Sequence, residues 1–230
     1  MLGFVKAFNW RETQKGFTET PGLIDYQNDR GRNFLHLCCM VDVEKTKSLN
    51  PKDSIKLAAL LIALGLDISA PAFDQHNWKA TPLWHAFQGS NYDLAGYLLK
   101  EGCDPEHCLW SAAMAGDLKQ AKLLLAHSAS VDPVYDSDGT TPLLLAVKGR
   151  HWAVAEVLLK AGANANIQDP NKRTSLHWAL KNGAEPKHVE TLFKYGASGD
   201  IEDGDRRTAE AIMRRKRDPA FGKMADRFLA

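Results

Sequence analysis

The chain has 230 residues, of which 44% are hydrophobic and 25% are charged, a composition that excludes disorder as a description of most of it. Its 29 Lys and Arg residues nearly balance 28 Asp and Glu residues, so no field of one sign calls for nucleic acid or an anionic membrane as a partner. Four cysteines are too few for a disulfide scaffold and predict a reducing, cytoplasmic location. Export without a cleaved signal would leave the same pattern.

The first 27 residues precede any repeated pattern. Lys6 interrupts the apolar start of this segment, and no small-residue cleavage site follows an apolar core, so we expect no secretory signal. We expect residues 1–27 to form an N-terminal helical cap. The longest uncharged apolar run, residues 57–66, is far shorter than the roughly 20 residues that a membrane span needs.

From about Asn28 onward, two short phrases alternate along the chain. The first is of the Thr-Pro-Leu type and occurs at Thr81–Trp84, Thr141–Leu144 and Thr174–His177, with degraded copies at 33–36 and 107–110. The second is rich in Leu and closes on a small residue: Gly65, Gly102, Ser128, Gly162 or Gly196.

The spacing of the two phrases is regular. Leu143 and Leu176 are separated by one period of about 33 residues. The Leu of the first phrase and the closing residue of the second keep one and the same separation in three units: 83 to 102, 109 to 128 and 143 to 162. A distance that recurs in this way indicates one repeated structural unit.

The chemistry of the two phrases predicts where helices begin and end. A Thr at the N-cap accepts a backbone N–H of the first turn, and a Pro at the first helical position loses no donor. A His three residues after the Thr can bond back to its hydroxyl, much as in a capping box. The Gly after the second phrase ends the second helix in a left-handed conformation. Neither helix can bury its apolar stripe alone, so the units must stack.

With these phrases at this period, the chain resembles the ankyrin-repeat family over nearly nine-tenths of its length. The resemblance implies an all-α solenoid of about five helix-turn-helix units joined by short hairpin turns. We place the five repeats at 28–70, 74–105, 106–133, 134–167 and 168–201, followed by a C-terminal capping repeat at 202–230.

Three units depart from the pattern. The first unit is longer between its two phrases than the others, and we expect the excess, residues 41–54, to form a loop that is either simply tolerated or functional. In the third unit the first phrase follows Gly102 too closely to leave room for a hairpin. The hairpin between units two and three should therefore be missing and leave a notch in the row of hairpin tips. The fifth has one extra residue near Gly183, and Pro186 should start its second helix.

The cysteines and histidines are expected to have structural roles. All four cysteines, Cys38, Cys39, Cys103 and Cys108, fall at small-residue packing positions, and no pair has zinc-ligand spacing with a matching second pair. The repeat's own His position is occupied by His36 and His177. The next, inward-facing position is occupied by His85 and Trp178, which we expect to make core or inter-repeat contacts. We therefore expect no metal and no cofactor.

The usual residue patterns of enzyme active sites are absent from the sequence. It contains no Gly-rich phosphate loop, no GxSxG and no HExxH. The carboxylate pairs Asp136/Asp138 and Asp203/Asp205 fall in expected hairpin turns, where Asp favours turn formation. We expect no catalytic residues; the alternative is an enzyme whose site lies in residues 41–54 or in the N-terminal segment.

A basic cluster at 206–207 and 214–217 is the sharpest charge feature. It would suit an acidic partner, nucleic acid or a localisation receptor. We favour a solvated capping helix instead, because Asp203, Asp205, Glu210 and Asp218 balance the cluster.

The resemblance implies that a partner protein binds on a concave face formed by hairpin tips and the ends of the first helices. Transferred by position, the candidate partner-binding residues are Arg30, Arg32, Asn77, Trp78, Lys79, Gln88, Met114, Ser137, Asp138, Thr140, Lys148, Asn171, Arg173, Lys181 and Arg207. Trp78 stands out, because Trp and Arg are enriched among interface hot spots. Its alternative role is to pack on the extended segment 70–73.

The resemblance, supported by the absence of catalytic residue patterns, implies a non-enzymatic protein–protein interaction module, used as an adaptor or as an inhibitor of the immunity type. A Trp with Arg residues around it suits a partner protein whose surface is acidic and partly apolar. We expect neither nucleic acid nor a membrane as a partner, and a monomer when the protein is alone. The alternative is a secreted effector that acts on host proteins. The sequence does not identify the partner.

Overall fold

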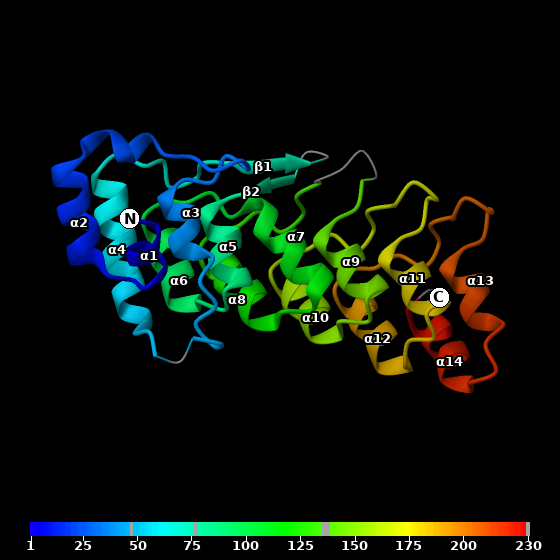
Figure 1. Cartoon of the computed structure of the whole chain (residues 1–230). Helices are drawn as coiled ribbons and strands as arrows, with labels where there is room; N and C mark the ends of the chain where they lie inside the picture. Colours follow the sequence, from blue (N-terminus) through cyan, green and yellow to red (C-terminus); the bar gives the residue numbers. More distant parts are fainter. Residues whose placement is uncertain (47, 76–77, 135–138, 229–230) are drawn as a thin grey trace. The chain divides into compact units, whose positions relative to one another are not determined.

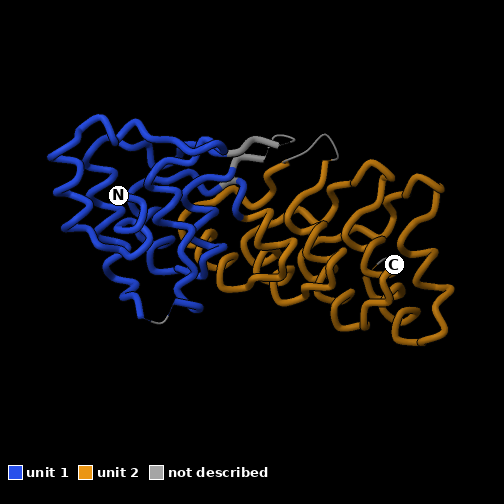
Figure 2. The backbone as a smooth tube through the Cα atoms, viewed as in Figure 1, with its two compact units in different colours: residues 1–108 blue, residues 109–230 orange. Residues whose placement is uncertain are grey.

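The structure is a computed structural model that describes residues 1–46, 48–75, 78–134 and 139–228, with the backbone alone described at 73–75, 78–79 and 106. Three predicted partner-binding residues, Asn77, Ser137 and Asp138, lie outside the described residues, as do the side chains of Trp78 and Lys79. The chain divides into two compact units, residues 1–108 (unit 1) and 109–230 (unit 2), which are coloured separately in Figure 2.

Unit 1 is built from pairs of helices and one short hairpin. Its elements are α1 (Leu2–Lys6), α2 (Trp10–Glu19), the 3-10 helix η1 (Pro21–Asp25), α3 (Phe34–Cys39), α4 (Pro51–Ala63), β1 (Ala72–Gln75), β2 (Trp78–Ala80), α5 (Pro82–Gln88) and α6 (Tyr92–Lys100). Helices α1, α3 and α5 pack in succession in one layer, and α2, α4 and α6 pack in the other. The N-terminal segment is therefore helical, and its α1–α2 pair continues both layers.

Unit 2 repeats the same two-layer arrangement. The division between the units falls within α7 (Glu106–Ala115). The elements that follow are α8 (Leu118–Ala126), α9 (Pro142–Lys148), α10 (Trp152–Lys160), α11 (Ser175–Lys181), α12 (Pro186–Lys194), α13 (Ala209–Arg214) and α14 (Pro219–Phe228). Figure 1 shows α9, α11 and α13 side by side, with α10, α12 and α14 as the second layer.

The predicted fold class, an all-α repeat of helical pairs joined by hairpin turns, is confirmed. Among the described residues, the named strands are confined to the antiparallel hairpin of β1 and β2. Each predicted repeat range contains two helices, and so does the predicted capping repeat. The boundaries between the repeats stay a prediction.

Helices begin and end as the two phrases predict. Thr81 Oγ1 accepts the backbone N–H of Trp84 at 3.3 Å, and Thr141 Oγ1 accepts that of Leu144 at 3.4 Å. The closing glycines adopt the left-handed conformation, with φ of 98° at Gly65, for example. The core runs between the two layers, and the Leu of the first phrase is fully buried in every repeat: Leu35, Leu83, Leu109, Leu143 and Leu176.

The long first repeat differs from its prediction at one end. Helix α4 already begins at Pro51 and includes four residues of the segment 41–54 that we expected to form the loop between α3 and α4. Asn50 caps this helix by accepting the N–H of Lys52 at 3.1 Å. The loop is tied down where the N–H of Val43 donates to the carbonyl of Gly89 at 3.1 Å. A Cβ at Gly89 would lie 2.6 Å from a backbone oxygen of the loop, so this contact requires glycine.

Candidate protein-binding surface

The hairpin tips are built around an Asx side chain that fixes the backbone of the turn. In unit 2, Asp169 Oδ1 accepts the N–H groups of Asn171 at 2.9 Å and Arg173 at 3.0 Å. Asp203 makes the same pair of bonds to the second and fourth residues after it, at 2.9 and 3.0 Å. Asn28 does so in unit 1, with both bonds at 3.0 Å. Because the side chain organises these turns, the tip residues are presented on a defined backbone.

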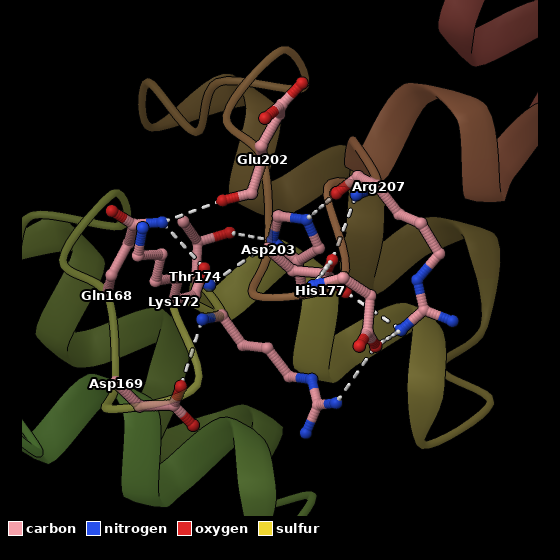
Figure 3. Close-up of polar contacts among 10 residues, drawn as sticks. Gln168, Asp169, Lys172, Thr174, His177, Glu202, Asp203 and Arg207 are labelled. Atoms are coloured by element: carbon pink, nitrogen blue, oxygen red, sulfur yellow. Dashed lines mark hydrogen bonds and ion pairs between the residues drawn. The ribbon is translucent and has the colours of Figure 1, made fainter.

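Histidine and glutamine side chains join one turn to the next (Figure 3). The Nδ1 atom of His177 lies 2.9 Å from the hydroxyl of Thr174, and its Nε2 atom lies 3.1 Å from the carbonyl oxygen of Arg207 in the following turn. Gln168 Nε2 donates to the carbonyl oxygen of Glu202 at 2.9 Å. The predicted bond from this His to the N-cap Thr is confirmed, and the same ring also connects two repeats.

His36 plays the same part in unit 1. Its Nδ1 atom lies 2.7 Å from Asn33 Oδ1, and its Nε2 atom lies 2.9 Å from the carbonyl oxygen of Ala70. Burial lowers the pKa of His36 to about 4, and burial lowers the pKa of the neighbouring His85 to about 3. Both rings are therefore neutral at pH 7. The expectation that these are structural histidines is confirmed.

In unit 2, three of the predicted partner-binding cations meet around one aromatic ring. The Nζ atoms of Lys148 and Lys181 lie 4.8 and 4.5 Å from the ring centre of Trp178, and the guanidinium carbon of Arg173 lies 5.6 Å from it. The indole N–H donates to Asp169 Oδ2 at 2.8 Å, which orients the ring. Cations within about 6 Å of a Trp face are attracted to it.

The charges of this cluster are only partly compensated. Burial opposes the charge on Asp169, but the N–H groups of Arg173 and Trp178 and the ammonium of Lys148, 3.4 Å away, outweigh it and lower the pKa of Asp169. Arg173 has an ion pair with Asp205 at 3.8 Å. Lys181 is exposed, and no carboxylate among the described residues pairs with it. The Trp178 ring is itself partly exposed.

Other predicted residues lie around this cluster or apart from it. Met114, at the end of α7, is 53% exposed, and Asn171 is exposed at its tip. Arg207 is exposed and paired with Asp203 at 3.0 Å and with Asp205. Thr140 is only 7% exposed, so the structure leaves it little surface for a partner. In unit 1, Gln88 and Arg30 are exposed and Arg32 is half-buried.

We call the set formed by Lys148, Asn171, Arg173, Trp178, Lys181 and Arg207 the Trp178 surface. Trp178 was expected to make core or inter-repeat contacts, because it occupies the same repeat position as His85. His85 is indeed 3% exposed, whereas Trp178 is partly exposed and carries cations on its ring. One signal was present in the sequence: Lys181 follows Trp178 by three residues, which places both on one face of a helix.

The cysteines pack as expected. All four thiols are free and at most 3% exposed. Burial raises the pKa of Cys103 to about 11 and raises those of the other three thiols further. Within the described part of the chain, no group of three His, Cys, Asp or Glu side chains is arranged to hold a metal ion.

Several cations of the C-terminal basic cluster are engaged within the capping repeat or with the repeat before it. Arg214 pairs with Glu210 at 2.9 Å and with Asp226 at 2.8 Å. Lys216 Nζ donates to the carbonyl oxygen of Leu180 at 2.8 Å. These contacts agree with the interpretation of the cluster as the solvated face of a capping repeat.

Comparison with known proteins gives a family and a fold. The sequence profile of the family described as "Ankyrin repeats (3 copies)" matches residues 109–203. The chain is 38% identical over 73 residues to inversin of Gallus gallus, covering 32% of this chain and 7% of that protein. It is 30% identical over 169 residues to the transient receptor potential cation channel subfamily A member 1 of Homo sapiens, covering 70% of this chain and 14% of the channel.

Among solved structures, the ankyrin repeat domain of human ASB11 superimposes with a TM-score of 0.67 at 18% identity, covering 92% of this chain and 90% of that domain. This likeness shows the fold alone. The chain spans only 7 to 14% of the length of the curated relatives just named. None of the helices in the described residues has the length and apolar character that a membrane span requires.

Proposed function

Because this chain is an ankyrin-repeat protein, we propose that it is a non-enzymatic module that binds a partner protein through the Trp178 surface. Ankyrin repeats generally mediate protein–protein interaction. The observation that carries the proposal is a partly exposed Trp with three cations 4.5 to 5.6 Å from its ring centre, on the tips and first-helix ends of unit 2. Trp and Arg are the residue types in which binding energy concentrates.

The chemistry of this surface favours a partner that is acidic and partly apolar. The partly exposed ring of Trp178 offers apolar contact, while Lys181 offers an ammonium without a carboxylate partner among the described residues. Hydrogen bonds fix the turn that carries Arg173 and the ring of Trp178. A surface that is fixed before binding loses little conformational entropy when a partner binds.

Both proposed modes of action need a bound partner protein and no chemical reaction. An adaptor would use the Trp178 surface to hold a partner near another protein, and an inhibitor of the immunity type would use it to cover the partner's own site. The four free, buried thiols support a reducing compartment, such as the cytoplasm, as the place of action.

The proposal is tested by identifying a partner with the tagged chain as bait and then measuring its affinity for variants by calorimetry. We expect Trp178→Ala and Lys181→Glu each to raise the Kd at least tenfold, which corresponds to about 1.4 kcal/mol. Lys181→Glu is the cleaner variant, because Lys181 is exposed and its loss leaves no described carboxylate unpaired. Trp78→Ala is included as a separate arm, because the role of Trp78 stays a prediction.

Trp152→Ala is the matched control. It removes an indole from α10, in the second layer of the same unit, where the ring stacks on His188 at 4.4 Å. We expect this variant to keep the wild-type Kd. An unchanged Kd for both Trp178→Ala and Lys181→Glu, in proteins that melt at nearly the wild-type temperature, would disprove the proposal.

A further inference from the structure

A cavity of about 520 Å³ lies in unit 1, between the end of α1, the turn before α3 and the loop after α3. Leu37, Met40 and Val41 form its apolar lining, and Lys6 and Arg32 are its two cations. Pockets that take small ligands or single side chains of a partner are of this size and of this mixed character.

The two cations of the cavity are not neutralised by ion pairs among the described residues of unit 1. Arg32 Nε is buried, and no hydrogen-bond acceptor reaches it among the described residues. Neither Arg32 nor Lys6 takes part in an ion pair within the described part of the chain. Asp42 is the acidic residue of the lining, but it pairs with Lys45 at 2.8 Å and accepts the N–H groups of Glu44 and Lys45.

An arginine in this state has a definite chemical requirement. A guanidinium cannot lose its proton in a protein, so the positive charge of Arg32 persists beside the cavity without an ion-pair partner among the described residues. A carboxylate meets the requirement best, because its two oxygens match the fork of a guanidinium. Because the lining next to Arg32 is apolar, a ligand that complements the cavity also carries an apolar group beside its carboxylate.

We propose that this cavity binds a Glu or Asp side chain carried by a segment of another protein, with a neighbouring apolar side chain of the segment on Leu37 and Met40. A protein segment fits better than a free small acid because Met40 is 39% exposed. The apolar contact therefore continues outside the cavity, where a passing chain would cover it and a small acid would not. This site is separate from the Trp178 surface and does not depend on it.

The test is a titration of the ¹⁵N-labelled full chain, followed by NMR, with three probes. The probes are acetyl-Leu-Glu-Leu-amide, its neutral counterpart acetyl-Leu-Gln-Leu-amide, and hexanoate. We expect the Glu peptide to shift the amide resonances of residues 37–42 and to bind at least tenfold more tightly than either of the other two. Equal affinity for the Gln peptide would overturn the role of the carboxylate, and equal affinity for hexanoate would overturn the choice of a protein segment.

Variants locate the binding at Arg32. Arg32→Met keeps a long apolar side chain but removes the charge, and should weaken the Glu peptide at least tenfold. Arg30→Met makes the same change two residues away, outside the cavity lining, and should change the affinity less than twofold. Equal effects of the two variants would contradict the proposal. If Arg32→Met does not fold, Lys6→Met provides the same comparison, because Lys6 is exposed at the end of α1.

Discussion

The side chain of His177 both supports the N-cap of its own helix and connects its turn to the next one. Its ring is 2% exposed and contacts both the N-cap Thr174 and the carbonyl of Arg207 in the next turn. Replacing it by Ala leaves the buried hydroxyl of Thr174 and the partly buried carbonyl of Arg207 without this contact. We therefore expect His177→Ala to lower the free energy of unfolding by about 1–3 kcal/mol, measured by urea denaturation.

His127→Ala is the control for that measurement. The ring of His127 makes no hydrogen bond within the described part of the chain, so its removal should change the unfolding free energy by no more than about 0.5 kcal/mol. Equal losses in the two variants would show that the contacts of His177 do not stabilise the protein.

The neutral pair His36 and His85 makes the stability of the chain depend on pH. The folded-state pKa values of about 4 and 3 lie below the 6.5 of an unfolded histidine, chiefly because of burial. The charge of Arg32 adds to the lowering at both rings, whereas Asp67 opposes it at His36. Below pH 6.5 the unfolded chain binds protons that the folded chain does not, so the contribution of these histidines is present above pH 6.5 and is lost as the pH falls.

The expected loss is about 1.4 kcal/mol per pH unit for each histidine, from pH 6.5 down towards its folded-state pKa. Urea denaturation at pH 7, 6 and 5 measures it. His36→Gln and His85→Gln should each show a shallower decline with pH than the wild type. If the slopes of all three proteins coincide, these histidines are not the source of the acid sensitivity.

At the scale of the element, the residue that ends the second helix of each repeat is a glycine in most repeats and a serine in one. Ser128 has a φ of 62° at the position where the other repeats have glycine. A left-handed conformation costs a non-glycine residue about 1–2 kcal/mol. A glycine avoids this cost but loses more backbone entropy on folding, which offsets about 0.5–1 kcal/mol of the gain. We expect Ser128→Gly to stabilise the chain by about 0.5–1 kcal/mol in thermal and urea unfolding.

Gly162→Ala is the converse change. Gly162 has a φ of 94°, and a Cβ there would meet no atom within 4 Å, so the substitution tests the backbone conformation without a steric clash. We expect a destabilisation of similar size. A stabilising effect of Gly162→Ala, or a destabilising one of Ser128→Gly, would contradict this account of the helix ends.

Most of these elements could be predicted because their signals are local. Thr81 and Thr141 cap helices by bonds that reach only three residues along the chain, and Gly65 closes one by its own backbone conformation. The start of α4 was predicted wrongly because Pro51 has two meanings. A Pro marks loops, but it also fits the first position of a helix, and the cap from Asn50 selects the second meaning.

At the scale of the whole molecule, the sequence predicts which repeat positions lie at the turns and helix ends. It does not predict which side chains from different repeats contact one another there. Lys148 and Arg173 were predicted separately, from their places in two repeats. That both lie against Trp178 follows from the stacking of α9 on α11 and from the bond of the indole to Asp169. The unpaired state of Arg32 is likewise invisible in sequence, because it depends on which carboxylates the fold brings near.

The burial of all four thiols also determines how this protein can be studied. Maleimides react with thiolates, and these thiols are at most 3% exposed, with pKa values raised by burial. The native chain should therefore stay unlabelled under conditions that modify an exposed cysteine. One cysteine introduced at Lys181 would then give a single attachment point for a fluorophore, beside Trp178, without removing any native residue from the core.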